Sequence, residues 1–459
     1  MSGVPRLGSE LRKLVALALP LSLAQLAQSG MSFVDTLFVG RLGPTSLAGL
    51  ALGSTVFFTV FNVLMAVLLS VAPLVAHSIG ARRESEPGLI TGQALLLAVE
   101  LALPGMAIFF NAGPLLTLLG LPASSVEPAA AYLRAITPGL PFALGFVALR
   151  GLLEGHGDAR PILLMALAGV GLNVFINDTL IFGRYGLPAF GIVGVGVTTA
   201  AVYALLFVAA TVLVRRKYRH QAAFASMRRL DRARLSEILR VGWPISIMLG
   251  LEVSAFSVAT FVLGGFGDSV LAGHQIAMQS SSMTFMIPLG IATATAVLVG
   301  QAAGRRDPEG VRRAGALGIG LSISFMSLSA LLFWLAPHVV IGLFVDLNAP
   351  ENLELVGYAA TFLAIAAMFQ IVDGMQVTAQ GALRGLKDTR VPMLLTLVAY
   401  WFVGIASGLI LTHVVGIGPR GMWFGLVAGL AVAALLLVLR FSRLSGRTAS
   451  AARLPRVAG

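Results

Sequence analysis

Long apolar stretches, separated by short polar or charged segments, recur along the whole chain. A helix needs about 20 apolar residues to cross a bilayer, so this pattern predicts membrane-spanning helices. Hydrophobic residues make up 57% of the sequence and charged residues only 11%, which excludes an ordinary soluble domain. The predicted spans are residues 14–40, 47–77, 89–112, 129–153, 161–182, 190–214, 238–263, 270–300, 312–336, 357–383, 391–414 and 421–440.

The second half of the chain repeats the pattern of the first. Pro20 corresponds to Pro244 at an offset of 224 residues, and the segment A-L-R-G recurs at 148–151 and 382–385 at an offset of 234. Each half holds six spans and therefore begins on the same side of the membrane, which indicates parallel repeats. We expect an all-α polytopic membrane protein, with twelve transmembrane helices in two pseudo-symmetric six-helix lobes.

The basic residues predict how the chain is oriented. All of the 32 Lys and Arg except Arg41, Arg134, Arg184 and Arg420 fall on one side of the predicted membrane. By the positive-inside rule this side is cytoplasmic, as are both termini, and we expect the cytoplasmic (inner) membrane of a prokaryote. Because the net charge of +12 follows this topology, no nucleic-acid partner is predicted. The predicted parts are an N-terminal lobe, a basic cytoplasmic linker and a C-terminal lobe with a basic tail, at residues 1–214, 215–237 and 238–459.

A few acidic residues lie inside the apolar spans, where an ionisable group is costly and marks a functional site by default. They are Asp35, Glu100, Asp178, Glu252 and Asp373. The strongest candidates are Asp35, Glu252 and Asp373, because no Lys or Arg lies mid-span to neutralise them. None of these three recurs at the equivalent position of the other half, which favours a specialised site over packing.

Neutral polar residues accompany these acids. Asn173 and Asn177, with Asp178, lie on the fifth span and complete the ion-coupling candidates of the first half. Carboxylate, amide and hydroxyl oxygens suit a proton or a hard cation such as Na⁺, which we expect at Asp35, Glu252 and Asp373. No other cofactor is predicted. The candidates for lining a substrate cleft between the lobes are Gln28, Gln275, Gln279, Met283, Phe285, Met286, Phe369 and Gln370.

Three motifs resemble a known transporter family. They are V-D-T-L-F-V-G-R-L-G at 34–43, N-V-F-I-N-D-T-L-I-F-G at 173–183 and A-L-R-G-L-K-D-T at 382–389. Together with the duplication they resemble the multidrug and toxic compound extrusion (MATE) transporters, over roughly residues 10–440. The resemblance implies two six-helix lobes arranged in a V, and export of drugs driven by inward movement of sodium ions or protons.

The pattern of acids is most similar to the NorM-type branch of that family. The acids of its first, seventh and tenth spans match Asp35, Glu252 and Asp373. Two positions depart from related patterns. Asn177 stands where another branch carries its fifth-span aspartate, and Asp178 follows one position later. Phe369 stands where NorM-type relatives are expected to carry a tyrosine, which leaves an ion site without a phenol at that place.

The predicted function is therefore a secondary antiporter that exports cationic or amphipathic compounds and acts as a monomer among membrane lipids. Pro20 is the candidate hinge that bends the first span when Asp35 changes state. A flippase for lipids or lipid-linked saccharides shares the two-lobe plan and stays open as an alternative, although its anionic cargo calls for a cationic cavity. No Ser/His or HExxH-like arrangement indicates an intramembrane enzyme. A passive channel is a further alternative, although it leaves the duplication and the acids with less purpose.

Overall fold

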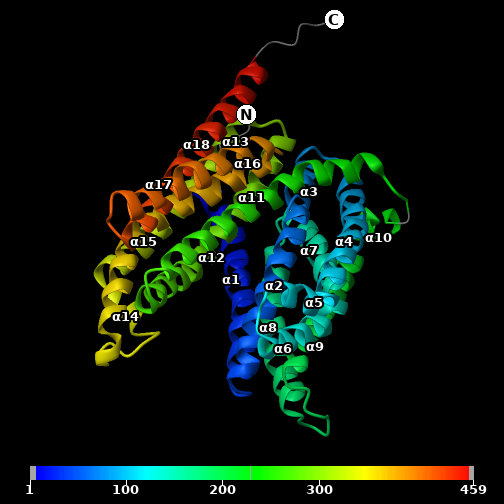
Figure 1. The fold of residues 1–459 in the computed structure, drawn as a ribbon. Coiled ribbons are helices and arrows are strands. Elements are labelled where there is room, and N and C mark those ends of the chain that lie inside the picture. Colours follow the sequence, from blue (N-terminus) through cyan, green and yellow to red (C-terminus); the bar gives the residue numbers. More distant parts are fainter. Residues whose placement is uncertain (1–6, 228, 454–459) are drawn as a thin grey trace, which may run out of the picture. The chain divides into compact units, whose positions relative to one another are not determined.

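The computed structural model describes residues 7–227 and 229–453, and the chain in these ranges forms helices and no strand (Figure 1). Within them, 12 helices are long and apolar enough to cross a membrane. Each predicted span coincides with one of these helices, so the predicted number is confirmed. Three of the basic residues that predict the orientation, Arg6, Arg228 and Arg456, lie outside the described residues.

The helices form two compact units, whose boundaries differ from those predicted from the two sequence halves. Unit 1 comprises Met1–Leu23 and Ile247–Gly459, and unit 2 comprises Ala24–Ser246. The predicted linker, residues 215–237, belongs to unit 2. The difference from the predicted lobes, 1–214 and 238–459, lies in the first helix of each half, which contributes one part to each unit.

These two helices are α1 (Leu7–Gly40) and α11 (Arg232–Gly264), and each contains an internal proline. The first part of α1 belongs to unit 1 because it packs on that unit: Ser22 Oγ donates a hydrogen bond to the Ile287 carbonyl at 2.9 Å. The first part of α11 is held in unit 2 in the same way, since Ser246 Oγ donates to the Val63 carbonyl at 2.6 Å. Each helix passes from one unit to the other only a few residues after its proline.

The remaining helices follow the same order in both units. Unit 2 contains α2 (Pro44–Leu68), α3 (Val71–Gly80), α4 (Glu86–Phe110), α5 (Ala112–Leu118), α6 (Ala123–Ile136), η1 (Thr137–Gly139), α7 (Leu140–Gly155), α8 (Ala159–Phe182), α9 (Ile192–Lys217), η2 (Arg219–Gln221) and α10 (Ala223–Ser226). Unit 1 contains α12 (Asp268–Gly304), α13 (Pro308–Leu335), α14 (Pro337–Ile341), η3 (Pro350–Asn352), α15 (Leu353–Gly385), α16 (Arg390–Leu397), the π-helical η4 (Val398–Ile405), α17 (Ala406–Leu409), the π-helical η5 (Ile410–Val414) and α18 (Pro419–Arg453).

The duplication seen in the sequence extends to unusual backbone conformations. Gly43 and Gly267, which correspond at the 224-residue offset, precede α2 and α12 with φ of 104° and 108°. Such angles are open to glycine and strained for other residues. Arg82 and Arg306, at the same offset, have φ of 57° and 56°. The two halves therefore share their turns as well as their helices.

Repeated glycines also set how closely helices pack inside each unit. A Cβ atom at Gly385 of α15 would lie 2.6 Å from the Ala296 carbonyl oxygen of α12. At the equivalent Gly151 of α7, it would lie 2.8 Å from Val71 Cβ of α3. Small residues at such crossings let membrane helices approach closely. In unit 1 this close contact fixes the orientation of α15, which carries one of the candidate acids.

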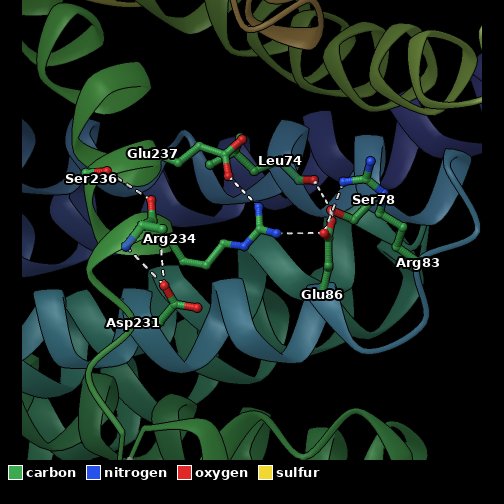
Figure 2. Close-up of polar contacts among 9 residues, drawn as sticks. Leu74, Ser78, Arg83, Glu86, Asp231, Arg234, Ser236 and Glu237 are labelled. Atoms are coloured by element: carbon green, nitrogen blue, oxygen red, sulfur yellow. Dashed lines mark hydrogen bonds and ion pairs between the residues drawn. The ribbon is translucent and has the colours of Figure 1, made fainter.

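The linker is fastened to unit 2 by a partly buried polar cluster, shown in Figure 2. Arg234 donates to Glu86 Oε1 at 2.6 Å and to Glu237 Oε2 at 2.8 Å. Next to this cluster, Gln93 Nε2 donates to the Arg229 carbonyl at 2.9 Å. Since Glu86 and Gln93 both lie on α4, the chain that enters α11 is tied to the body of unit 2.

Candidate functional site

Asp35 is the centre of the polar cluster in unit 2. It is partly buried on α1, and two asparagines of α8 face its carboxylate. Asn173 Nδ2 donates to Asp35 Oδ1 at 3.0 Å, and Asn177 Nδ2 donates to the same oxygen at 2.6 Å. Residues four apart lie on one face of a helix, so both amides reach the same carboxylate. The structure thus brings together three of the predicted coupling residues.

A chain of polar side chains extends from this cluster through α1 to α7. The Gln28 amide hydrogen-bonds the hydroxyl of Tyr203, whose ring on α9 also lies close enough to Asp35 for electrostatic interaction. Arg150 Nη1 donates to Gln28 Oε1 at 3.5 Å, and Arg150 Nε donates to Glu154 Oε1 at 2.7 Å. Because Glu154 balances its charge, Arg150 does not have to be neutralised by Asp35.

Asp178 is separate from the Asp35 cluster. Its Oδ2 accepts from Arg184 Nη1 at 3.1 Å near the end of α8, and its side chain is 26% exposed. One step along a helix turns a side chain by about 100°, so the residue after Asn177 cannot share its face. The structure gives Asp178 an ion-pair partner near the end of the span and does not bring it to the other predicted coupling residues.

Glu252 and Asp373 meet in unit 1. Glu252 lies on α11 in the part that belongs to this unit, and the Tyr400 hydroxyl of η4 donates a hydrogen bond to its carboxylate. Gln376 Nε2 donates to Tyr400 Oη at 2.7 Å. Asp373 is buried one turn before Gln376 on α15, close enough to Glu252 for electrostatic repulsion between the two carboxylates. Two like charges in an apolar interior are unfavourable together unless a proton or cation lies between them.

Glu252 borders a small pocket, and Asp373 has a buried oxygen without a partner among the described residues. A small pocket beside Glu252 is lined by Tyr400, Gly404 and Gly429, among other residues. Within the described residues, the buried Oδ1 of Asp373 has no hydrogen-bond partner. Two carboxylates with a phenol and a pocket offer oxygen ligands of the kind that a proton or Na⁺ requires.

The predicted cleft residues of α12 fall on one exposed face. Gln275, Gln279 and Met283 are exposed and follow one another at intervals of four residues. Phe285 and Met286 are partly buried beside them. Glutamines spaced in this way on a membrane helix favour a face in contact with water or substrate over one covered by lipid tails.

Two other predicted cleft residues, Phe369 and Gln370, are in the interior of unit 1. Phe369 is 3% exposed and packs edge-on against Phe256 and Trp423. Gln370 is fully buried, and its amide is used at both ends: Oε1 accepts from Thr284 and Nε2 donates to Ser329. Neither side chain lines an exposed surface, because α15 is surrounded by other helices at this level.

Sequence reasoning did not single out three residues of these clusters: Tyr203, Tyr400 and Arg150. Tyr400 supplies Glu252 with the phenol that Phe369 lacks, from a different helix. A tyrosine in the middle of an apolar span needs a partner for its hydroxyl, and this signal was available for Tyr203 and Tyr400. Arg150 was marked by the repeated A-L-R-G segment, but the segment does not show which side chains the arginine reaches.

Comparisons with known proteins agree on one family. The model of the MatE family matches residues 20–179 and 244–410. The probable multidrug resistance protein NorM of Burkholderia mallei is 41% identical over 446 residues, covering 96% of this chain and 94% of that protein. The probable multidrug resistance protein NorM of Deinococcus radiodurans is 40% identical over 433 residues, covering 94% and 95%.

The fold agrees with a solved structure. The outward-facing conformation of a multidrug resistance MATE family transporter matches with a TM-score of 0.85. The match covers 96% of this chain and 97% of that one, at 22% sequence identity. At this identity the likeness establishes the shared helical fold.

Proposed function

The chain belongs to the MATE family of multidrug transporters, and from this premise we propose that it exports cationic or amphipathic compounds in exchange for a coupling cation bound by buried carboxylates. It is a multidrug efflux antiporter rather than an enzyme. The observation that carries the coupling proposal is the Glu252–Asp373 pair, two interacting carboxylates with a phenol in the interior of unit 1.

The two carboxylates perform the exchange by changing charge. While neither carboxylate holds a cation, their negative charges attract a cationic substrate. Without a counter-charge these two negative charges are unfavourable in the apolar interior of the unit. A proton or Na⁺ taken up at Glu252 and Asp373 removes the repulsion between them and the attraction for the substrate, which is then released. Each positive charge that moves inward supplies about 2.3 kcal/mol per 100 mV of membrane potential. Because export of a monovalent cationic substrate moves one positive charge outward, exchange for one ion is electroneutral and is driven by the concentration gradient of that ion. A second ion per cycle adds the membrane potential as a driving force.

Asp35 with Asn173 and Asn177 is the second proposed cation site. Its carboxylate already receives two amide hydrogen bonds, which stabilise it without a bound ion. We assign it a supporting part in coupling, and we assign Asp178 no part, because Asp178 is paired with Arg184.

Pro20 is the proposed hinge. It lies within α1, 15 residues before Asp35, and it removes one backbone hydrogen bond from the helix. The part of α1 that contains Pro20 belongs to unit 1, whereas the part that contains Asp35 belongs to unit 2. A change of charge at Asp35 would thus alter the part of α1 that belongs to unit 2, and the helix would bend at Pro20. Unchanged coupled transport in Pro20→Ala would rule this hinge out.

The setting of the protein follows from the same premises. The chain is a multi-pass membrane protein, and we propose the inner membrane of a bacterium with the basic linker and both termini in the cytoplasm. A monomer is sufficient, because each proposed ion site is built from residues of one unit.

Transport by the purified protein in liposomes tests the proposal. Efflux of a fluorescent cationic dye is followed under a sodium gradient alone and then under a pH gradient alone. Acceleration by either gradient identifies the coupling ion and supports antiport, and Glu252→Gln should abolish that acceleration. Dye movement under neither gradient would contradict the proposal and favour a lipid or anionic cargo.

A further inference from the structure

A line of polar side chains runs along α15 from the proposed ion site toward one end of the helix. Asp373, Gln376, Gln380 and Arg384 follow one another at intervals of three or four residues, which places them on one face. Asp373, Gln376 and Gln380 are buried, with exposed fractions of 5%, 0% and 6%. At 1.5 Å per residue the line extends about 16 Å beyond Asp373.

Three atoms of this line lack a protein partner. In the described part of the chain, the buried atoms Asp373 Oδ1, Gln376 Oε1 and Gln380 Nε2 form no hydrogen bond. Each such atom costs about 1–3 kcal/mol unless something satisfies it, and the usual solution is a buried water molecule with two to four polar partners. Two acceptors and then a donor follow one another along one face here, so the line offers successive positions for water.

The rest of the surface of α15 is built differently. Gly381 and Gly385, about 95° and 135° around the axis from the mean direction of the polar line, allow the backbone of α12 to approach so closely that a Cβ atom would collide with it. Ala382, about 165° from that direction, is fully buried in an apolar cluster. Small residues thus close much of the remaining surface, and the carboxylate and amide atoms that no described residue pairs with are confined to one face.

The far end of the line carries a positive charge. Arg384 lies in the last turn of α15 and interacts electrostatically with Glu252. A fixed arginine at the end of a narrow path disfavours a cation that rests there, and this limits leak through an otherwise hydrated route.

We propose that the polar face of α15 is a hydrated path by which the coupling cation leaves Asp373 and Glu252 toward the cytoplasm. The path rests on the proposed antiport function and adds the route that the ion takes inside unit 1. Gln376 and Gln380 are positioning residues that hold water in this route, and Arg384 marks its cytoplasmic end.

Thiol labelling tests the path without any transport. The chain has no cysteine, so Gln380→Cys, Gln376→Cys and the control Ala382→Cys each carry a single thiol. A small charged thiosulfonate is added from the cytoplasmic side of oriented vesicles. Gln380→Cys should react at least about tenfold faster than Ala382→Cys, because apolar surroundings raise a thiol's pKa and suppress the reactive thiolate. Equal rates, or reaction only from the opposite side, would overturn the path.

Transport then tests what the path does. Gln380→Leu should slow gradient-driven dye efflux at least about tenfold, because loss of one water position raises the barrier to movement of the coupling cation along the path. Dye binding at equilibrium should stay unchanged. Ala382→Ser should behave as the parent, and Gln380→Asn should restore part of the rate. Unchanged efflux in Gln380→Leu would overturn the path's role in coupling. Failure of the parent to respond to either gradient would instead contradict the proposed function, and the labelling ratio would still decide whether the path is hydrated.

Discussion

The carboxylates of the two units are held in opposite ways. In unit 2, Asp35 receives two amide hydrogen bonds on one oxygen. In unit 1, Glu252 receives a single phenol, and Asp373 has a buried oxygen to which no described residue donates. A carboxylate already satisfied by donors gains little from an ion, whereas two close carboxylates with open oxygens gain much. The comparison supports the proposal that unit 1 holds the principal coupling site.

The difference can be traced to two positions of the duplicated chain. Counted from Pro161 and Pro392, which begin equivalent spans, Asn173 and Asn177 correspond to Gly404 and Gly408. The glycines let α18 come close, and Gly404 lines the pocket beside Glu252. One half thus fills its site with amide donors, and the other leaves room there.

Loss of the carboxylate pair is expected to have the largest effect. Glu252→Gln and Asp373→Asn should each reduce gradient-driven efflux to the background of protein-free liposomes. The reason is that a neutral amide has no negative charge with which to bind and release the coupling cation. Dye binding measured by equilibrium fluorescence controls for folding. Normal driven efflux in both variants would remove unit 1 from the coupling mechanism.

Loss of the phenol comes next. Tyr400→Phe removes the donor to Glu252 and the acceptor for Gln376, at a cost of about 1–3 kcal/mol, so the concentration of coupling ion needed for half-maximal efflux should shift about tenfold. Tyr203→Phe in unit 2 is the matched control and should shift it less, since two asparagines still hold Asp35. Equal shifts would show that the phenols do not distinguish the units.

A smaller effect is expected when Asp35 loses one amide. Asn177→Ala leaves Asn173 as a donor, so the rate of driven efflux should fall by a few-fold, about 1 kcal/mol for one net hydrogen bond. Complete loss of coupling, measured in the same liposomes, would place the principal site in unit 2 instead.

The smallest effect should follow from Asp178→Asn. Its partner Arg184 is 57% exposed, and ion pairs at exposed positions contribute about 0–1 kcal/mol. The rate of driven efflux and the coupling-ion concentration for half-maximal efflux should both stay within about twofold of the parent, as expected for so small a change in free energy. A loss of coupling comparable to that in Asp35→Asn would return Asp178 to the ion site.

The sequence predicted the helices well because membrane spans are marked by continuous apolar length, and Glu252 and Asp373 stood out by their cost in such spans. Residue contacts were harder to predict. The assignment of the first part of α1 to unit 1 depends on packing by residues such as Ser22, which no periodicity reveals. Phe369 and Gln370 were expected in a cleft, yet both are buried, because the sequence of one helix does not show how many neighbours surround it.

Cation-induced release of a bound fluorescent substrate from the purified protein tests the central claim most directly. The parent, Glu252→Gln and Asp35→Asn are titrated side by side with sodium at fixed pH and with protons at fixed sodium. The account predicts that Glu252→Gln loses the release by the coupling ion, while Asp35→Asn retains it at a higher ion concentration. Loss of release in Asp35→Asn with full release in Glu252→Gln would contradict it.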